Sequence, residues 1–102
     1  MTKLIALYRT PKNPAAFDEY YFQRHLPLAK KVPGLRRYQV NSGPIGAPTE
    51  PGPIHLAAIL EFADQAALQA AFASPEGQAA VADIANFADG GAELLVFDTK
   101  DI

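Results

Sequence analysis

The sequence predicts an α+β fold in which four strands form one antiparallel sheet and the helices cover one of its faces. The first observation is the order of the elements, which is strand, helix, strand, strand, helix, strand. The second is the size and composition. A chain of 102 residues that is 49% hydrophobic and 20% charged suits one globular domain with one hydrophobic core. We expect this single domain to span residues 1–102.

The first strand is predicted over residues 3–9, an apolar stretch of β-forming residues that ends at a breaker cluster, residues 10–14. Asn13 is suited to cap a helix that has Pro14 in its first position. Side chains spaced three or four residues apart then predict the buried stripe of that helix, which comprises Phe17, Tyr21, Arg24, Leu28 and Val32.

A break is expected inside this helix. Pro27 has no amide hydrogen and its ring clashes with the preceding turn, so the helix should kink or restart just after His25. His25 falls at one edge of the buried stripe and Tyr20 at the other. The Pro33-Gly34 pair ends the helix.

Two further strands follow, separated by a long surface loop. Residues 35–42 alternate in a way that predicts a strand with one wetter face. Seven of the eleven residues from 43 to 53 are Pro or Gly, which predicts the loop. Residues 54–63 are mostly apolar, so this strand should be central in the sheet and covered on both faces.

The second helical region is expected in two pieces. Asp64 can cap the first piece, and Ser74 followed by Pro75 and Glu76 is a new start signal. Leu68 and Phe72 predict the buried face of the first piece, and a second stripe is formed by Val81, Ile84 and Phe87. A Gly-Gly pair then precedes the last strand, residues 92–99.

Two right-handed β-α-β units in one antiparallel sheet give the ferredoxin-like arrangement, with both helical regions on one face. Apolar strand residues then point away from the helices on the other face. A domain of this size cannot expose them without creating an aggregation-prone patch. We therefore expect a second copy of the chain to cover that face, which makes the protein a homodimer.

Composition excludes several classes of chemistry. Zero cysteines exclude a disulfide scaffold, a thiol nucleophile and an iron–sulfur cluster, and two histidines fall short of a typical histidine-rich metal site. We expect no metal and no cofactor. A net charge of −2 argues against a nucleic acid partner, and the absence of a long apolar run argues against a membrane. With no secretory signal pattern at its start, the chain is expected in the cytoplasm.

The net charge conceals an asymmetry. The chain carries +6 up to Arg37 and −8 beyond it. The basic region either binds an anion, attracts the acidic region across a subunit contact, or interleaves with it within one protomer, and we favour interleaving by antiparallel packing.

Several segments together resemble the EthD family of the dimeric α+β barrel superfamily. They are L-Y-R at residues 7–9, H-L-P-L at 25–28, P-G-L-R-R-Y at 33–38, S-P-E-G at 74–77 and D-I-A-N-F at 83–87. The resemblance implies a homodimer whose sheets pack face to face, with a pocket between sheet and helices in each subunit. Members of this family were first noted in a gene cluster for ethyl tert-butyl ether degradation. Similar folds include isomerases, cyclases, decarboxylases, monooxygenases and haem-dependent enzymes.

His25 is the best candidate for catalysis, because an imidazole with a pKa near neutrality suits proton transfer and the resembled family places this histidine in the pocket. Alternatively, its ring only forms a hydrogen bond with a backbone carbonyl that lacks a donor because Pro27 has no amide hydrogen, and it helps to fix the helix end. Tyr38 is the second catalytic candidate, since a phenol can hold or protonate a substrate oxygen. Alternatively, Tyr38 is a core or interface aromatic, which is the more common role.

Weaker candidates for ligand binding are Tyr8, Tyr21, Arg9, His55 and Glu61. Alternation along the third strand puts His55 on the same face as Glu61, but about 20 Å away, so the two should not form a dyad. His55 is expected to be solvent-exposed. Glu61 is the one carboxylate of an apolar strand, and an acid–base role stays open for it.

Two functions remain open at this point. In the first, the protein is a cofactor-independent enzyme (an isomerase, cyclase, decarboxylase or monooxygenase) that acts on a small hydrophobic or aromatic metabolite. In the second, it is a non-catalytic dimeric module that binds such a ligand or accompanies a larger oxygenase. Polar groups that converge in a closed cavity would favour the enzyme, and a dry cavity would favour the binder.

Overall fold

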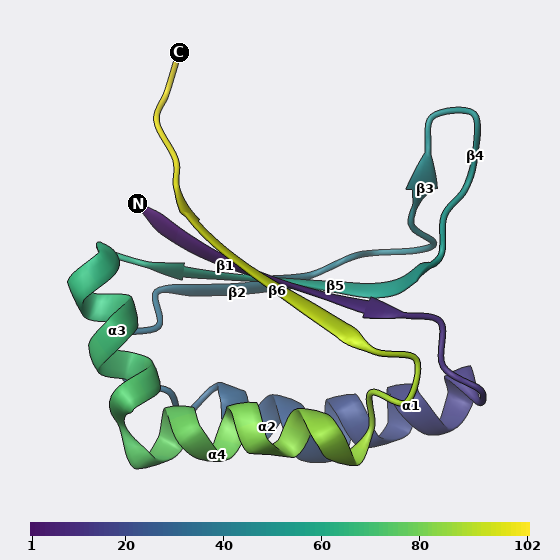
Figure 1. Ribbon diagram of the computed structural model, residues 1–102, viewed down its shortest axis with the longest axis horizontal. Helices are drawn as coiled ribbons and strands as arrows, with labels where there is room; N and C mark the ends of the chain where they lie inside the picture. The colour runs from purple at the N-terminus through teal and green to yellow at the C-terminus, as the bar shows by residue number, and fades with distance from the viewer.

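A computed structural model describes the backbone of all 102 residues and every side chain except those of Glu50 and Pro51. Four strands form one antiparallel sheet in the order β2-β5-β1-β6. They are β1 (Thr2–Arg9), β2 (Arg37–Val40), β5 (Ile54–Phe62) and β6 (Ala92–Asp98). All helices lie on one side of this sheet (Figure 1). The fold is therefore the α+β, ferredoxin-like arrangement that the element order predicts.

The helices start where their capping residues predict. They are α1 (Pro14–Tyr20), a π-helical turn (Tyr21–His25), α2 (Leu26–Ala29), α3 (Gln65–Ala73), α4 (Pro75–Asp83) and a 3-10 turn (Ile84–Asn86). The side chains of Asn13, Asp64 and Ser74 each accept a hydrogen bond from a backbone amide in the first turn of α1, α3 and α4. Capping thus fixes the boundaries of all three.

The predicted loop contains a short hairpin, β3 (Gly46–Ala47) paired with β4 (Glu50–Pro51). The hairpin and the C-terminal tail, residues 99–102, rise from opposite ends of the sheet (Figure 1). Both stand on the side away from the helices. The open face of the sheet therefore lies between two projections.

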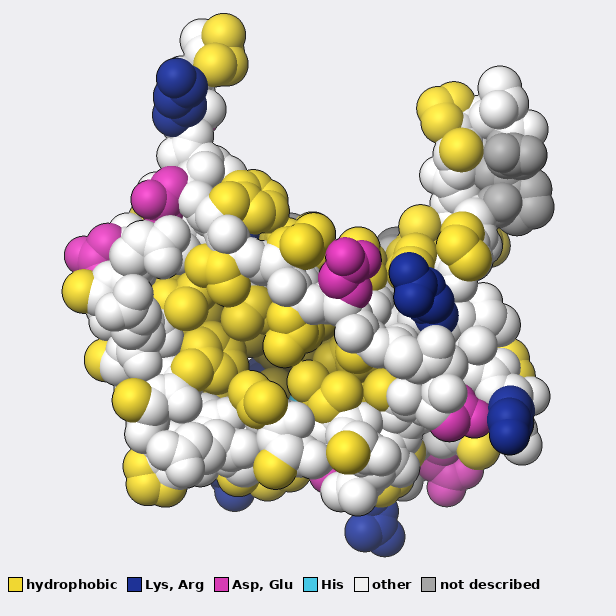
Figure 2. All heavy atoms as spheres, viewed as in Figure 1, with side chains coloured by type: hydrophobic (Ala, Val, Ile, Leu, Met, Phe, Trp, Pro, Cys, Tyr) yellow, Lys and Arg dark blue, Asp and Glu magenta, His cyan; other side chains and the backbone are white. Residues whose placement is uncertain are grey.

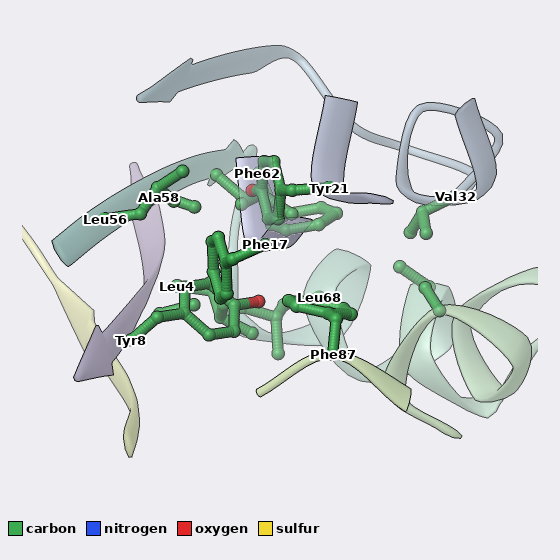
Figure 3. Close-up of a cluster of buried hydrophobic side chains, with 14 residues drawn as sticks. Leu4, Tyr8, Phe17, Tyr21, Val32, Leu56, Ala58, Phe62, Leu68 and Phe87 are labelled. Atoms are coloured by element: carbon green, nitrogen blue, oxygen red, sulfur yellow. The ribbon is translucent and has the colours of Figure 1, made fainter. Parts of the chain in front are cut away.

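The core fills the space between the sheet and the helices. Side chains of β1 and β5 alternate between buried and half-buried positions, and the buried ones face the helices. Tyr8, Phe17, Tyr21 and Phe87 meet there at ring-centroid distances of 5.2 to 5.9 Å (Figure 3). The other sheet face has no such cover, although β5 is central as predicted.

The buried stripe of the first helical region differs from the prediction. Arg24 is exposed, whereas His25 is only 4% exposed. The cause is the π-helical turn, in which the amide of Leu26 donates to the carbonyl oxygen of Tyr21, five residues earlier. The extra residue in this turn shifts the buried positions to a spacing of four, so that Phe17, Tyr21, His25 and Ala29 all face inward.

The stripe predicted for α4 is also partly wrong. Val81 is 44% exposed, and the buried positions are Gly77, Ala80 and Asp83. Small residues face inward because α4 lies very close to the end of α3. A Cβ atom added to Gly77 would lie 2.1 Å from the carbonyl oxygen of Ala71. This close packing brings Asp83 into the interior.

One ion pair joins the basic and the acidic regions of the chain. Lys3 of the basic half pairs with Glu61 of the acidic half across neighbouring strands, and theirs is the one Lys or Arg ion pair among the described side chains. None of the helices in the described part of the chain combines the length and apolar character that a membrane span requires.

Candidate functional site

A cavity lies between the sheet and the helices. Its enclosed volume is about 40 Å³, and the empty space that continues through its mouth into open solvent brings the total to about 410 Å³. It opens between β6 and α4, where hydrophobic side chains surround a hollow (Figure 2). The polar side chains that line it are Tyr8, His25 and Tyr38. The enclosed volume is far smaller than the roughly 300–1,000 Å³ of ligand pockets, so a ligand would also have to occupy the open mouth.

His25 and Asp83 form a buried pair beside this cavity. His25 Nδ1 lies 3.0 Å from Asp83 Oδ2. Hydrogen bonds to Asp83 lower the pKa of its carboxyl, even though its desolvation by burial acts in the opposite direction. The carboxylate is therefore ionised and can only accept, so Nδ1 must carry a proton, and in the neutral imidazole Nε2 is then free of one.

Two more groups hold the carboxylate in place. The Tyr20 hydroxyl donates to Asp83 Oδ1 at 2.6 Å, and the Asn86 amide donates to the same oxygen at 3.0 Å. Burial lowers the pKa of His25, and the hydrogen bond to Asp83 offsets this only in part. His25 is consequently a neutral imidazole at pH 7, oriented by an ionised carboxylate.

Three phenols lie near His25: Tyr8 and Tyr38 line the cavity, and the Tyr21 ring packs against the imidazole. The Tyr21 and Tyr38 hydroxyls are 2.5 Å apart. Burial raises the pKa of Tyr8, Tyr21 and Tyr38, so all three are protonated at pH 7. Either hydroxyl can donate in the hydrogen bond that joins Tyr21 and Tyr38.

Two polar atoms are left for a ligand to contact. His25 Nε2 and the Tyr8 hydroxyl hydrogen-bond to none of the described residues. The described side chains include no fully buried polar atom without a partner, so both atoms must be reached from the cavity. The described lining includes no Lys, Arg, Asp or Glu. Burial of an ionised ligand group would be costly here, and the site fits an uncharged molecule.

The structure brings His25, Tyr38 and Tyr8 together in one cavity, with Tyr21 directly behind Tyr38. It does not bring Glu61 to them. Glu61 pairs with Lys3 on the opposite face of the sheet, and this hydrogen bond lowers its pKa. The side chain of Arg9 is exposed at the end of β1, outside the cavity lining.

The expected position of His55 is wrong. A register shift pairs Tyr8 with Leu56 but Arg9 with Ile54, which leaves His55 as the extra residue of a β-bulge. The bulge turns its ring toward α1 instead of leaving it in solvent. His55 Nε2 lies 2.7 Å from Asp18 Oδ1, and the ring packs against Phe17. His55 thus belongs to a separate, more exposed His–Asp pair outside the cavity lining.

Asp83 is the residue that sequence reasoning missed. It lies between two positions of the predicted apolar stripe, and a carboxylate there reads as a surface residue. The signal that could have found it is the run of small residues, Gly77 and Ala80, at spacings of three on the same helix face. No group of three or more His, Cys, Asp or Glu among the described residues has the arrangement of a metal site.

Comparison with known proteins agrees with this architecture. The EthD domain family model matches residues 9–91. The chain is 38% identical over 102 residues to an uncharacterized 11.0 kDa protein in the thcB-thcC intergenic region of Rhodococcus erythropolis, covering 100% of this chain and 98% of that one. It is 37% identical in sequence to an ethyl tert-butyl ether d (ethd) family protein from Bacillus halodurans, which has a crystal structure. That match has a TM-score of 0.90 and covers 98% and 99% of the two chains.

More distant structures share the fold alone. SnoaB, a cofactor-independent oxygenase from Streptomyces nogalater, is 16% identical with a TM-score of 0.68, covering 99% and 94% of the two chains. A dimeric ferredoxin-like protein of unknown function from Thermobifida fusca is 19% identical with a TM-score of 0.69, covering 96% and 90%. The family match over residues 9–91 and the two relatives above 35% identity lead to one conclusion: the chain belongs to the EthD domain family.

Proposed function

We propose that the protein catalyses proton transfer on a small, uncharged carbonyl or phenolic compound, using its own side chains as acid and base. The observation that carries the proposal is the buried His25–Asp83 pair, whose free Nε2 opens onto the same cavity as the hydroxyls of Tyr8 and Tyr38. The similarity in fold to a cofactor-independent oxygenase supports this choice of chemistry.

The geometry suggests a division of roles. His25 Nε2 accepts a proton from an acidic C–H or O–H bond of the ligand, and Asp83 stabilises the imidazolium that forms. The negative charge that develops on the ligand oxygen is stabilised by hydrogen bonds from the Tyr38 and Tyr8 hydroxyls, whose side chains already line the mostly apolar cavity. Return of the proton to another atom gives isomerisation, and cyclases, decarboxylases and cofactor-independent oxygenases pass through similar anions.

The lining favours an enzyme over a passive binding module. A protein that only binds a hydrophobic ligand needs only an apolar cavity. This cavity is also lined by an imidazole and two phenols, and His25 Nε2 and the Tyr8 hydroxyl have no hydrogen-bond partner among the described residues. Burying these groups costs free energy, and a carboxylate is buried behind the imidazole in addition. Proton transfer gives each of them a role.

We also propose that the functional unit is a homodimer joined through the open face of the sheet. That face carries Ile5, Leu7, Ile59, Leu95 and Phe97, and the helices of the same protomer cover the opposite side. A related fold is described as dimeric. Covering this face would remove the exposed apolar side chains from water.

The proposed chemistry can be tested without knowing the natural substrate. 2-Tetralone has an acidic C–H group next to an uncharged carbonyl, and its exchange with D₂O can be followed by proton NMR. We expect the wild-type protein to accelerate exchange and H25Q to lose the acceleration, roughly 10²–10⁴-fold, because glutamine cannot accept the proton. The wild-type rate should rise with pH and level off above the pKa of His25, which lies below 6.5.

The matched control is H55Q, which removes the histidine of the His55–Asp18 pair outside the cavity lining. It should exchange 2-tetralone at the wild-type rate. Equal rates for H25Q and the wild-type protein, with both folded, would contradict a role for His25 as the base.

A further inference from the structure

Strand β6 forms one edge of the sheet and pairs with β1 alone. Its side chains are exposed along its whole length, even though its central residues are all apolar. Leu94 and Leu95 are 43% and 42% exposed, and Val96 and Phe97 are each 45% exposed. An apolar edge strand with both faces in solvent is weakly held and prone to pair with other chains.

The two faces of β6 belong to different surfaces. Leu94 pairs with Ala6 of β1 and lines the cavity, at the mouth where Val81 and Ile84 of α4 also lie. Leu95 and Phe97 alternate with it and point to the open face of the sheet, beside Ile5 and Lys3. One strand therefore forms part of the cavity wall with one face and part of the open sheet face with the other.

A second copy of the chain is the occupant that best fits the open face. The four strands have 8, 4, 9 and 7 residues, and at ~3.4 Å per residue and ~4.8 Å per strand they give a footprint of roughly 460 Å². The hairpin and the C-terminal tail stand on the same side and extend it (Figures 1 and 2) toward the roughly 800 Å² per partner of a standard interface.

Charge also permits this face to meet a copy of itself. Apart from Arg9 at the end of β1, the charged side chains of the face are Lys3, Arg37, Glu61 and Glu93, which sum to zero. Lys3 and Glu61 are already paired with each other. A patch that packs against itself across a two-fold axis must avoid an excess of one sign, and this one does.

We infer that the second copy, by covering Leu95 and Phe97, holds β6 in place and so completes the wall of the ligand cavity, with the result that dimer formation and ligand binding strengthen each other. The inference rests on the proposed function and on the proposed dimer. Coupling of this kind is reciprocal: if dimer formation raises ligand affinity by some factor, saturating ligand raises dimer affinity by the same factor per site.

The test compares the wild-type protein with two variants of the open face, F97E and I59E. Each places a charge in the face, and Ile59 lies on β5 away from the cavity lining. Sedimentation velocity establishes the oligomeric state. Binding of 2-naphthol, an aromatic mimic of the 2-tetralone enol, is measured by titration, and hydrogen exchange of the β6 backbone by mass spectrometry. We expect both variants to be folded monomers that bind 2-naphthol about fivefold or more weakly than the dimer.

Hydrogen exchange separates the failure of this inference from the failure of the proposed function. The inference predicts faster exchange in β6 of both monomeric variants, with β1 and β5 still protected, whether or not 2-naphthol binds. Unchanged β6 protection, unchanged affinity in the monomers, or a wild-type protein that is monomeric at micromolar concentration would each overturn it. Absence of 2-naphthol binding to the wild-type dimer would instead count against the proposed function.

Discussion

D83N should reduce the rate of 2-tetralone exchange by about 10²-fold or more while the protein stays folded. Tyr20 and Asn86 both donate to Oδ1, which keeps the oxygen of the new amide on their side. The amide nitrogen then faces His25 and donates to Nδ1, so the imidazole proton moves to Nε2. A protonated Nε2 cannot act as a base, and the loss should appear in the rate rather than in 2-naphthol binding.

The matched control for this variant is D18N, at the second His–Asp pair. Asp18 is about half exposed and binds His55, so its replacement leaves the tautomer of His25 unchanged. We expect D18N to exchange 2-tetralone at the wild-type rate. If D83N retained the full rate, or if D18N lost as much, the assigned role of Asp83 would be wrong.

Replacing Gly77 with alanine should lower the free energy of unfolding by about 3 kcal/mol. The added Cβ would lie 2.1 Å from the Ala71 carbonyl oxygen and 2.6 Å from the Phe72 Cα, which are backbone atoms that cannot rotate away. Helix α4 would have to move away from α3, and Asp83 would move with it. Urea denaturation of G77A and wild-type protein measures the difference.

G52A is the matched control, because the nearest atom to a Cβ at Gly52 is 3.7 Å away, an ordinary contact distance. Its stability should stay within about 1 kcal/mol of the wild type. Equal urea midpoints for G77A and G52A would show that α3 and α4 are not in close contact.

The fold was predictable from the sequence because its signals are local. Asn13, Asp64 and Ser74 each cap the helix that follows them, and the order of the strands then leaves few topologies. The break near Pro27 was also predictable in position. Its form was not, because a π-helical turn depends on tertiary packing that favours Tyr21 and His25 over Arg24 as inward residues.

The site was predictable only in part. His25, Tyr38 and Tyr8 were candidates from their chemistry, and the structure places them around one cavity. Asp83 was not a candidate, because its burial depends on partners 58 and 63 residues away along the chain, His25 and Tyr20. Contacts at such separations leave no periodic pattern in the sequence. The bulge at His55 likewise arises from pairing between strands and reverses the face that alternation assigns.

The pH dependence of His25 follows from its burial. The folded protein holds the His25 proton only at a pH below 6.5, whereas the unfolded chain takes it up near 6.5. In that window the unfolded state binds more protons, so the His25 contribution to stability is lost as the pH falls below about 6.5.

The most direct test of the account is the protonation state of the His25 ring, measured by nitrogen–proton correlation NMR on protein labelled with ¹⁵N-histidine. The chain has two histidines, so H55Q assigns the signals. We predict that at pH 7 His25 is neutral with its proton on Nδ1, that it titrates below 6.5, and that 2-naphthol shifts the Nε2 signal. A neutral ring protonated on Nε2, a midpoint above 6.5, or an Nε2 signal that saturating 2-naphthol leaves unmoved would contradict the proposal that His25 is a base held by Asp83 at the ligand cavity.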